Sequence, residues 1–280
     1  MLAYTTSRDG VRSPRILYGT AWKQDRTDVC VRMALQMGFR GIDTACQPKH
    51  YNEAGVGAGI AACLGTELAR TELYLQTKFT PLAGQDPKRV PYDPLAALAE
   101  QVTQSLQTSL RNLQTGYVDG LVLHSPLRTP SELMEVWQAM EALRERGSVK
   151  QLGISNCYDP DVLALLFRRA TIKPAVVQNR FYADTGYDRD IRAFCAANQI
   201  VYQSFWTLTA NPQLLAHATI GSLAKRHGRS PAQILFRCLT QLGIVPLTGT
   251  TSVAHMRDDL AIFEFELQDD EQQAVVKLFE

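Results

Sequence analysis

Three observations on the amino-acid sequence predict a single domain, residues 1–280, folded as a (β/α)8 barrel of the TIM type. Short β-rich runs alternate with longer helical patterns along the whole chain. No linker rich in Pro, Gly or Ser and no change of composition divides the sequence. The rival fold is an open doubly wound sheet, but no GxGxxG motif opens a helix, and the first turn after a β-like run reads Gly-Thr-Ala-Trp at residues 19–22.

Eight segments have the composition of β-strands. They are residues 15–20, 40–45, 73–78, 118–124, 149–155, 175–179, 200–205 and 244–247. Parallel strands need covering helices between them, and closing the sheet into a ring removes both of its exposed edges. We therefore expect the eight segments to form one closed barrel.

The stretches between these strands have the spacing of amphipathic helices. Their ranges are 27–37, 53–64, 95–113, 131–146, 160–169, 188–198 and 230–242. In 95–113, apolar residues at positions 95, 98, 99, 102, 106, 110 and 113 repeat as on one helical face. Helices of this kind cover a sheet.

Composition and charge exclude several classes of partner. The 29 basic and 28 acidic side chains leave a net charge of +1, so no basic face is expected to bind nucleic acid. The first twenty residues carry charges and no apolar run, and the uncharged stretch 193–224 contains too many polar residues to cross a membrane. We expect a cytoplasmic protein with no membrane partner and leave its oligomeric state open, a monomer being compatible with the sequence.

Six cysteines are spread along the chain without a CxxC pair, which argues against both a zinc site and a disulfide framework. We therefore expect no metal. Cys46 and Cys157 are the two that follow strand-like segments, where a site could form.

Ionisable side chains stand at the ends of three consecutive predicted strands. Asp43, Lys78 and His124 each occur where an apolar run stops, and reactive side chains of a barrel belong at the carboxyl ends of its strands. Neighbouring strands lie about 4.8 Å apart, so Asp43 and Lys78 can form a salt bridge with His124 one strand further on. Taken singly, each residue has an ordinary alternative as a turn cap, a rim charge or a hydrogen-bonded rim histidine.

Tyr51 follows in the loop after the second strand. An isolated tyrosine is most often a packing residue with a solvated hydroxyl. Beside a lysine ammonium, its phenol is expected to ionise more readily than the reference pKa of about 10 allows, which would make it a usable proton donor.

Several segments together resemble the signature motifs of the aldo-keto reductase superfamily, in the same order. They are Gly-Phe-Arg-Gly-Ile-Asp-Thr-Ala at 38–45, Tyr-Asn-Glu at 51–53, Gln-Thr-Lys at 76–78, Leu-His-Ser-Pro at 123–126, Gly-Ile-Ser-Asn at 153–156 and Val-Gln at 177–178. The resemblance implies a (β/α)8 barrel, a nicotinamide cofactor bound without a Rossmann motif, and reduction of aldehydes or ketones. It maps the catalytic residues onto Asp43, Tyr51, Lys78 and His124, with Tyr51 protonating the carbonyl oxygen and His124 orienting it.

The tyrosine loop departs from the family pattern. Tyr51 stands eight residues after Asp43, not five, and directly precedes Asn52, where the family pattern has one residue between tyrosine and asparagine. Measured from Asp43 to Asn52, the loop carries a net insertion of two residues. Counting from Asp43 puts Pro48 at the tyrosine position, and counting back from Asn-Glu puts His50 there. Tyr51 is the only tyrosine in the segment and is the predicted proton donor, with His50 beside it.

The resemblance also implies a set of cofactor contacts. Thr20 is one of them. At the nicotinamide end they are Ser155, Asn156, Gln178 and the stacking residue Phe205, for which Trp206 is the adjacent-register alternative. At the phosphate end, after the eighth strand, they are Thr250, Ser252, His255, Arg257 and Asp259. The family's usual phosphate clamp has a lysine and an arginine where this sequence has Gly249 and His255, so both NADPH and NADH stay open, with a lean to NADPH through His255 and Arg257.

The substrate is expected to be a small carbonyl compound. Trp22, His50, Phe79 and Trp206 are the candidates for its pocket, and residues 79–93 are expected to form part of the rim. Two alternatives to an enzyme remain on the same fold. One is a regulatory cofactor-binding protein, like the family relatives that are auxiliary subunits of potassium channels. The other is a barrel that keeps the cofactor site but has lost efficient chemistry through its altered tyrosine loop.

Overall fold

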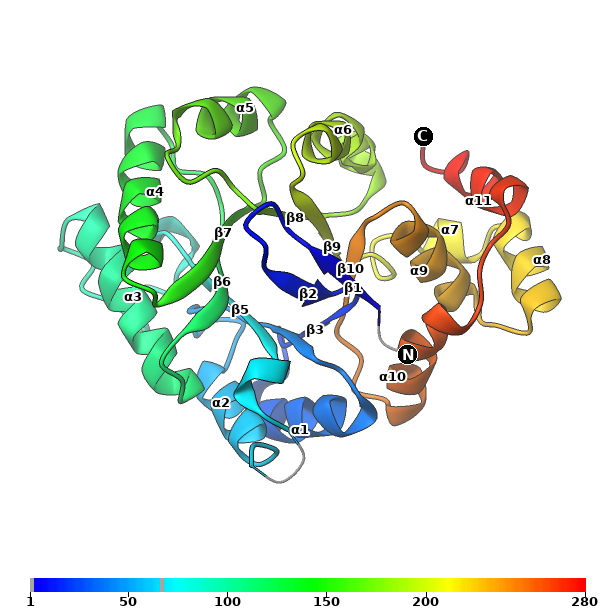
Figure 1. The fold of residues 1–280 in the computed structure, drawn as a ribbon, viewed down its shortest axis with the longest axis horizontal. Helices are drawn as coiled ribbons and strands as arrows, with labels where there is room; N and C mark the ends of the chain where they lie inside the picture. The colour runs from blue at the N-terminus through cyan, green and yellow to red at the C-terminus, as the bar shows by residue number, and fades with distance from the viewer. Residues whose placement is uncertain (1–2, 66–67) are drawn as a thin grey trace.

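Eight parallel strands close into a barrel in the computed structural model, which describes residues 3–65 and 68–280. The strands are β3 (Leu17–Gly19), β4 (Gly41–Asp43), β5 (Tyr74–Phe79), β6 (Val118–Leu123), β7 (Val149–Ser155), β8 (Val176–Arg180), β9 (Val201–Phe205) and β10 (Val245–Thr248). Their order around the barrel follows the chain, and β10 pairs with β3 to close the ring (Figure 1). The predicted (β/α)8 barrel is confirmed, because each strand overlaps one of the eight β-rich segments.

All seven predicted helices are present on the outside of the barrel (Figure 1). They are α1 (Thr27–Met37), α2 (Glu53–Ala61), α3 (Leu98–Leu113), α4 (Pro130–Glu145), α5 (Pro160–Arg169), α6 (Arg189–Ala197) and α9 (Pro231–Gln241). Two boundary predictions are wrong. The helix predicted over 53–64 ends at Ala61, and Leu95 lies outside α3 and is 93% exposed. Its backbone N–H donates to the Asp93 carboxylate in a turn around Pro94, so the chain is not yet helical there.

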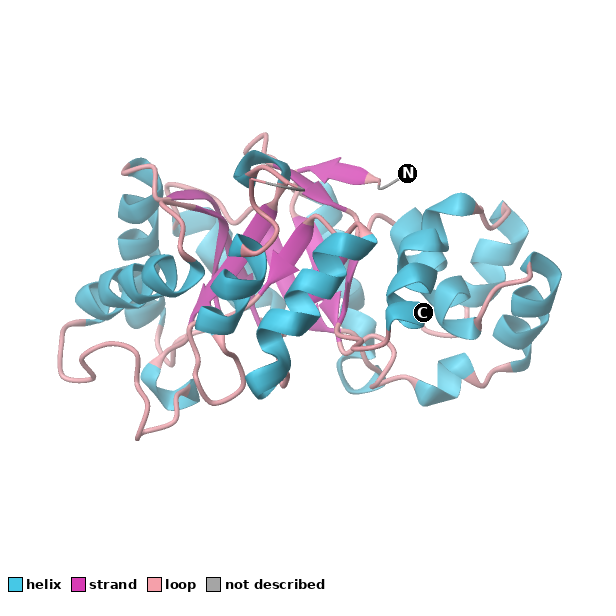
Figure 2. Cartoon of the chain, turned by 90° about the horizontal axis from the view of Figure 1, so that it is seen from below, coloured by secondary structure: helices cyan, strands magenta, loops and turns pink. Residues whose placement is uncertain are grey.

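Two groups of elements were not predicted. An antiparallel hairpin of β1 (Tyr4–Thr6) and β2 (Arg12–Pro14) covers one end of the barrel (Figure 2). The helices α7 (Pro212–Leu215), α8 (Ala218–His227), α10 (Val253–Leu260) and α11 (Asp269–Val276) gather around α9 on one side of it. A Cβ at Gly41, where β4 begins, would lie 3.2 Å from the Pro14 ring. The hairpin therefore closes the amino end of the barrel and leaves the carboxyl end to form a site.

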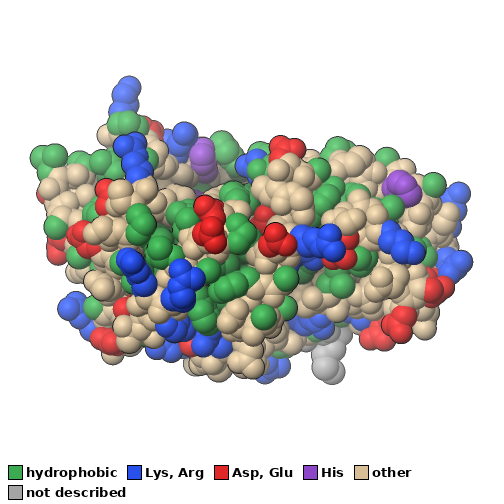
Figure 3. Space-filling view, turned by 90° about the horizontal axis from the view of Figure 1, so that it is seen from above, with side chains coloured by type: hydrophobic (Ala, Val, Ile, Leu, Met, Phe, Trp, Pro, Cys, Tyr) green, Lys and Arg blue, Asp and Glu red, His purple; other side chains and the backbone are tan. Residues whose placement is uncertain are grey.

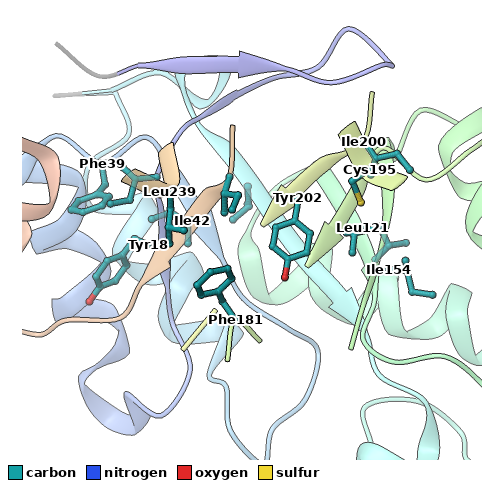
Figure 4. Packing of buried hydrophobic residues seen from close by; sticks show 14 of the residues in the cluster. Tyr18, Phe39, Ile42, Leu121, Ile154, Phe181, Cys195, Ile200, Tyr202 and Leu239 are labelled. Atoms are coloured by element: carbon teal, nitrogen blue, oxygen red, sulfur yellow. The ribbon is translucent and has the colours of Figure 1, made fainter. Parts of the chain in front are cut away.

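Most of the hydrophobic core lies between the barrel and its helices. Trp137 of α4 is fully buried, and the Tyr18 and Phe39 rings pack 5.6 Å apart beside Ile42 (Figure 4). Burying a large apolar side chain contributes about 1.5–3 kcal/mol, so this layer supplies much of the stability of the fold.

The inside of the barrel is different, because its apolar layer is thin. A separate small cluster lies near the amino ends of the strands and consists of Leu17, Tyr74, Val176, Val201 and Val245. Above it, Gln76 of β5 donates to Gln203 of β9 at 2.8 Å. These two strands are not neighbours, so their side chains meet across the interior. The polar residues of the site therefore stand on a closed apolar floor.

Charged side chains of both signs share the face of the protein drawn in Figure 3. Lysine and arginine are interspersed there with aspartate and glutamate, consistent with the net charge of +1. Among the helices in the described part of the chain, none is long and apolar enough to cross a bilayer.

Candidate active site

A cavity of about 1010 Å³ opens at the carboxyl ends of the strands, where a barrel is expected to carry its site. It is large enough for a cofactor and a small substrate together. Fourteen residues singled out from the sequence line it: Thr20, Trp22, Asp43, His50, Tyr51, His124, Ser155, Asn156, Gln178, Phe205, Trp206, Thr250, His255 and Asp259.

The predicted salt bridge between Asp43 and Lys78 is present beneath this cavity. Lys78 Nζ donates to Asp43 Oδ2 at 2.5 Å and to the Thr44 carbonyl at 2.8 Å, with both charged side chains almost fully buried. The other carboxylate oxygen, Oδ1, accepts from the amides of Gln76 at 2.7 Å and Gln178 at 2.9 Å. Burial lowers the pKa of Lys78, and the negative charge of Asp43 opposes that shift and favours the ammonium form.

Tyr51 lies against both Lys78 and His124. Lys78 Nζ is 5.4 Å from the centroid of the Tyr51 ring, and the ring of His124 meets that of Tyr51 edge-on with centroids 6.0 Å apart. The expectation that the Tyr51 phenol ionises more readily is wrong for this geometry. Burial and then the negative charge of Asp43 raise its pKa, so the hydroxyl holds its proton at neutral pH and can act as a donor.

His124 stands at the end of β6 as a neutral imidazole. Burial, then the charges of Lys78 and His50, lower its pKa to about 3. Its Nδ1 is 2.6 Å from the hydroxyl oxygen of Thr80, a buried residue just after β5.

The Thr80 contact favours one tautomer of His124. The Thr80 hydroxyl is buried and has no other acceptor within the described residues, so we infer that it donates its hydrogen to Nδ1 and does not leave it without a partner. The imidazole proton is then on Nε2, which makes this nitrogen the donor. Hydrogen bonds from Tyr92 and Gln85 to the Thr80 carbonyl, at 2.8 and 3.2 Å, hold Thr80 in place.

Aromatic side chains form one wall at the mouth of the cavity. The rings of Trp22 and His50 stack with centroids 3.9 Å apart, and the backbone N–H of Trp22 donates to the His50 carbonyl at 2.8 Å. Trp22 and Trp206 remain 59% and 46% exposed, so their faces are open to a ligand. Both have a left-handed backbone, with φ of 64° and 55°, a conformation that costs energy in a non-glycine residue and recurs at ligand sites.

Phe79 does not belong to this wall, and its placement in the substrate pocket was wrong. Side chains alternate between the two faces of a strand, so with Lys78 pointing into the barrel, Phe79 points out. Its ring is buried in the outer core, 5.7 Å from that of Tyr92, and it does not line the cavity.

The middle of the cavity presents polar groups suited to a carboxamide. Asn156 has φ of 51°, and its amide donates to the His124 carbonyl at 2.8 Å and to the Ser155 hydroxyl at 3.2 Å. Gln178 lies on the same wall, and Phe205 ends β9 on the inward face shared with Gln203. A hydroxyl and two amides beside an aromatic ring match the donors, acceptors and flat face of a nicotinamide.

The far end of the cavity has hydroxyls, backbone N–H groups and the start of α10. Ser252 caps this helix by accepting from the His255 N–H at 3.4 Å, so its hydroxyl serves the helix and does not line the cavity. Arg257 is exposed on the last turn of α10 and does not line the cavity either. Thr248 donates to the carboxylate of Asp259 at 2.7 Å, and burial raises the pKa of Asp259 to about 6. The start of a helix favours bound phosphate.

Lys23 is a site residue that the sequence reasoning missed. It follows Trp22 in the loop after β3, is 7% exposed and donates to the Gly249 carbonyl at 2.8 Å. A Cβ at Gly249 would lie 3.7 Å from Lys23 Nζ. The cation therefore lies beside the position where the family's lysine is replaced by glycine. Residues 23 and 249 meet only because β10 pairs with β3, a contact that their separation in the sequence hides.

A closed (β/α)8 barrel with a tyrosine, a histidine and a buried lysine–aspartate pair at one cavity has the architecture of a small-molecule enzyme. The model of the aldo/keto reductase family matches residues 15–280, so the chain belongs to that family of oxidoreductases, which act on carbonyl groups.

Known proteins extend this similarity along the whole chain. The sequence is 29% identical over 273 residues to methylglyoxal reductase DkgA of Yersinia pestis, covering 96% of this chain and 90% of the relative. A crystal structure of an aldo/keto reductase from Brucella melitensis has a TM-score of 0.84 at 28% identity, over 99% of this chain and 100% of the other. An aldo-keto reductase complexed with NADPH, 20% identical, shares the fold with a TM-score of 0.82, over 99% of this chain and 88% of the other.

Proposed function

We propose that the protein reduces aldehydes or ketones to alcohols with NADPH or NADH. The observation that carries the proposal is the cluster of Tyr51 and His124 above the Lys78–Asp43 ion pair, on one wall of the cavity. When bound, the nicotinamide supplies a hydride to the carbonyl carbon. Tyr51 supplies the proton to the carbonyl oxygen.

Each of the other three residues has a defined task in this scheme. The Nε2–H group of His124 donates to the carbonyl oxygen and stabilises the charge that grows on it. The ammonium of Lys78 offsets the charge left on Tyr51 when the proton leaves. Asp43 keeps Lys78 charged and fixes its position through their 2.5 Å contact.

Lys23 supports the preference for NADPH. No ion pair joins it to a carboxylate in the described part of the chain, yet it is almost completely buried. A buried ammonium needs a counter-charge, and burial lowers the pKa of Lys23 to about 8, so at neutral pH most of the side chains are charged. In NADPH the adenosine 2′-phosphate would supply that counter-charge, and NADH lacks this group.

The experiment for the catalytic proposal is Tyr51→Phe, with Tyr117→Phe as the matched control. Tyr117 immediately precedes β6 at the opposite end of the barrel. We expect Tyr51→Phe to lower kcat for a panel of aldehydes by a factor of roughly 100 to 10,000, the usual contribution of a general acid. NADPH affinity, followed by quenching of tryptophan fluorescence, should stay unchanged. Equal turnover of the two variants contradicts the proposal, and tight cofactor binding without turnover of any carbonyl indicates a regulatory or degenerate barrel instead.

The experiment for the cofactor preference is Lys23→Met. A hydrogen bond to a charged group is worth about 1.5–3 kcal/mol, so NADPH affinity should fall roughly 10- to 150-fold while NADH affinity changes little. Equal losses for both cofactors would place Lys23 at the pyrophosphate and remove this support for NADPH.

A further inference from the structure

Arg180 places an unpaired cation in the wall of the cavity. It ends β8, and alternation along the strand gives it the same inward face as Val176 and Gln178. Gln178 donates to Asp43 at the centre of the barrel, so Arg180, two residues later in β8, lies nearer the mouth of the cavity than Gln178 does. Residues 177–178 belong to the family motif, but nothing in that resemblance assigns a role to Arg180.

The guanidinium group of Arg180 lies against two aromatic rings. Its Cζ lies 4.5 Å from the centroid of the Trp206 ring and 5.0 Å from that of Tyr182. Cation–π contacts of this kind restrict a guanidinium while leaving its N–H groups available for a planar anion. The two rings therefore restrict Arg180 without consuming its hydrogen-bonding capacity.

The backbone of Arg180 is tied to the catalytic side of the cavity. Its N–H donates to the hydroxyl of Tyr158 at 3.2 Å, and that hydroxyl donates to Asn156 Oδ1 at 3.1 Å. Asn156 in turn donates to the backbone carbonyl of His124. These hydrogen bonds set the position of Arg180 relative to His124, the residue expected to bind the carbonyl oxygen.

No carboxylate neutralises Arg180 in the described part of the structure. Other partly buried arginines have a partner: Arg237 pairs with Glu266 at 3.1 Å and Arg70 with Asp119 at 2.9 Å. Arg15 and Arg40, which have no carboxylate partner, donate to backbone carbonyls instead. Arg180 forms no such ion pair, and its Nε is buried without a hydrogen-bond partner. Leaving donors of a charged group unpaired costs free energy, so the arrangement is suited to an anion from outside the chain.

We propose that Arg180 binds the carboxylate of an anionic carbonyl substrate, such as an oxo acid or a carboxylated aldehyde. The inference rests on the proposed carbonyl reduction and names its substrate class. The cofactor also carries anionic oxygens, but its phosphates have their own candidates at the far end of the cavity, at Lys23 and Thr250. Arg180 instead lies beside Trp206, one of the aromatic residues at the open mouth.

Matched substrate pairs test this assignment. Phenylglyoxylate and its methyl ester present the same ketone with and without a negative charge, as do 4-formylbenzoate and its methyl ester. We expect the acid of at least one pair to have a kcat/KM roughly 10- to 100-fold higher than its ester, because a charge-assisted bond forms with Arg180. Arg180→Met should abolish that preference and Arg180→Lys should keep part of it. Arg189→Met, at an exposed position at the start of α6, is the control and should change neither the kcat/KM for the acid nor that for the ester.

Binding measurements separate failure of this inference from failure of the proposed function. Calorimetric titration of phenylacetate into the protein saturated with NADP+ should show binding that is at least 10-fold weaker in Arg180→Met. This readout needs no turnover, so it stands even if no carbonyl is reduced. Equal kcat/KM for acid and ester in both pairs, or equal phenylacetate affinity in the two proteins, would overturn the proposal. A loss of NADPH affinity in Arg180→Met with an unchanged acid-to-ester ratio would assign the arginine to the cofactor and overturn it too.

Discussion

Replacing Asp43 by Asn should destabilise the protein strongly, because it removes one partner of a buried ion pair. Asp43 is 2% exposed and Lys78 is 1% exposed, and their charged groups are 2.5 Å apart. The NH2 group that Asp43→Asn introduces would face either the Lys78 ammonium or the donors of Gln76 and Gln178, which now bind Asp43 Oδ1. An uncompensated charge at such a site costs about 3–5 kcal/mol, a large part of the total stability of roughly 5–15 kcal/mol.

Urea unfolding of wild type, Asp43→Asn, Lys78→Met and the double variant measures this cost. The double variant removes the stranded charge, so it should be more stable than Asp43→Asn alone even though it carries one more substitution. Asp86→Asn breaks the exposed contact with Arg89 and serves as the control, with no measurable shift of the midpoint expected.

The stability that Asp43→Asn loses should also depend on pH, and the direction of that dependence follows from the pKa of Lys78. Burial already lowers the pKa of Lys78 in the folded protein, and removing Asp43 lowers it further because the favourable charge is gone. Between this lowered pKa and the value of about 10.4 in the unfolded chain, the unfolded chain binds more protons, so stability rises with pH. The deficit of Asp43→Asn should therefore shrink from about pH 7 to about pH 10. A deficit under about 1 kcal/mol, or a double variant less stable than Asp43→Asn, refutes the reasoning.

Two further substitutions test contacts that the structure defines. Thr80→Val removes the hydrogen bond to His124 Nδ1 and should lower kcat about 3- to 10-fold, and Thr80→Ser should restore kcat. ¹⁵N NMR of the histidine ring reports the tautomer in each variant. An unchanged ring spectrum in Thr80→Val would contradict the tautomer assignment. Gly57→Ala in α2 drives a Cβ into the Asn112 carbonyl oxygen and should lower the free energy of unfolding in urea by about 1–3 kcal/mol. A Cβ added at Gly221 in α8 meets nothing within 4 Å, so Gly221→Ala should be tolerated or stabilising. Equal effects at the two glycines would contradict the close packing of α2.

The sequence was sufficient for the barrel because its strands and covering helices differ strongly in pattern. It was insufficient for the β1–β2 hairpin, because Tyr4–Thr6 and Arg12–Pro14 contain no Val, Ile or Leu and so show no apolar run. Helix α8 did leave a signal, since Ile220, Leu223 and Ala224 are buried at helical spacing, but that signal lies in a stretch notable mainly for its lack of charge.

The site divides in a similar way between what is local in sequence and what is not. Asp43, Lys78 and His124 could be predicted because each stands at or next to the carboxyl end of a strand, and the ends of neighbouring strands must meet. Lys23 could not, because its contact with residue 249 depends on closure of the ring. Thr80 could not either, because the contact with His124 depends on how the chain turns after β5.

Alternation within a strand holds information that the sequence reasoning did not use. Once Lys78 is placed inside the barrel, Phe79 must point outward, and once Gln178 is inside, Arg180 must be too. The first consequence removes a residue from the substrate pocket, and the second adds a cation to it.

The same alternation explains how a fold with an apolar floor carries a polar site. Three strands repeat one inward order from the amino to the carboxyl end: Tyr74, Gln76 and Lys78; Val176, Gln178 and Arg180; Val201, Gln203 and Phe205. The first members exclude water, and the glutamines bond to one another and to Asp43, which satisfies the buried polar groups without adding charge. The third members face the layer where a ligand would lie. In these three strands a charged side chain therefore occurs only at the third inward position, next to the cavity. The amide layer beneath separates the Lys78–Asp43 pair from bulk water, which would weaken the electric field of the pair.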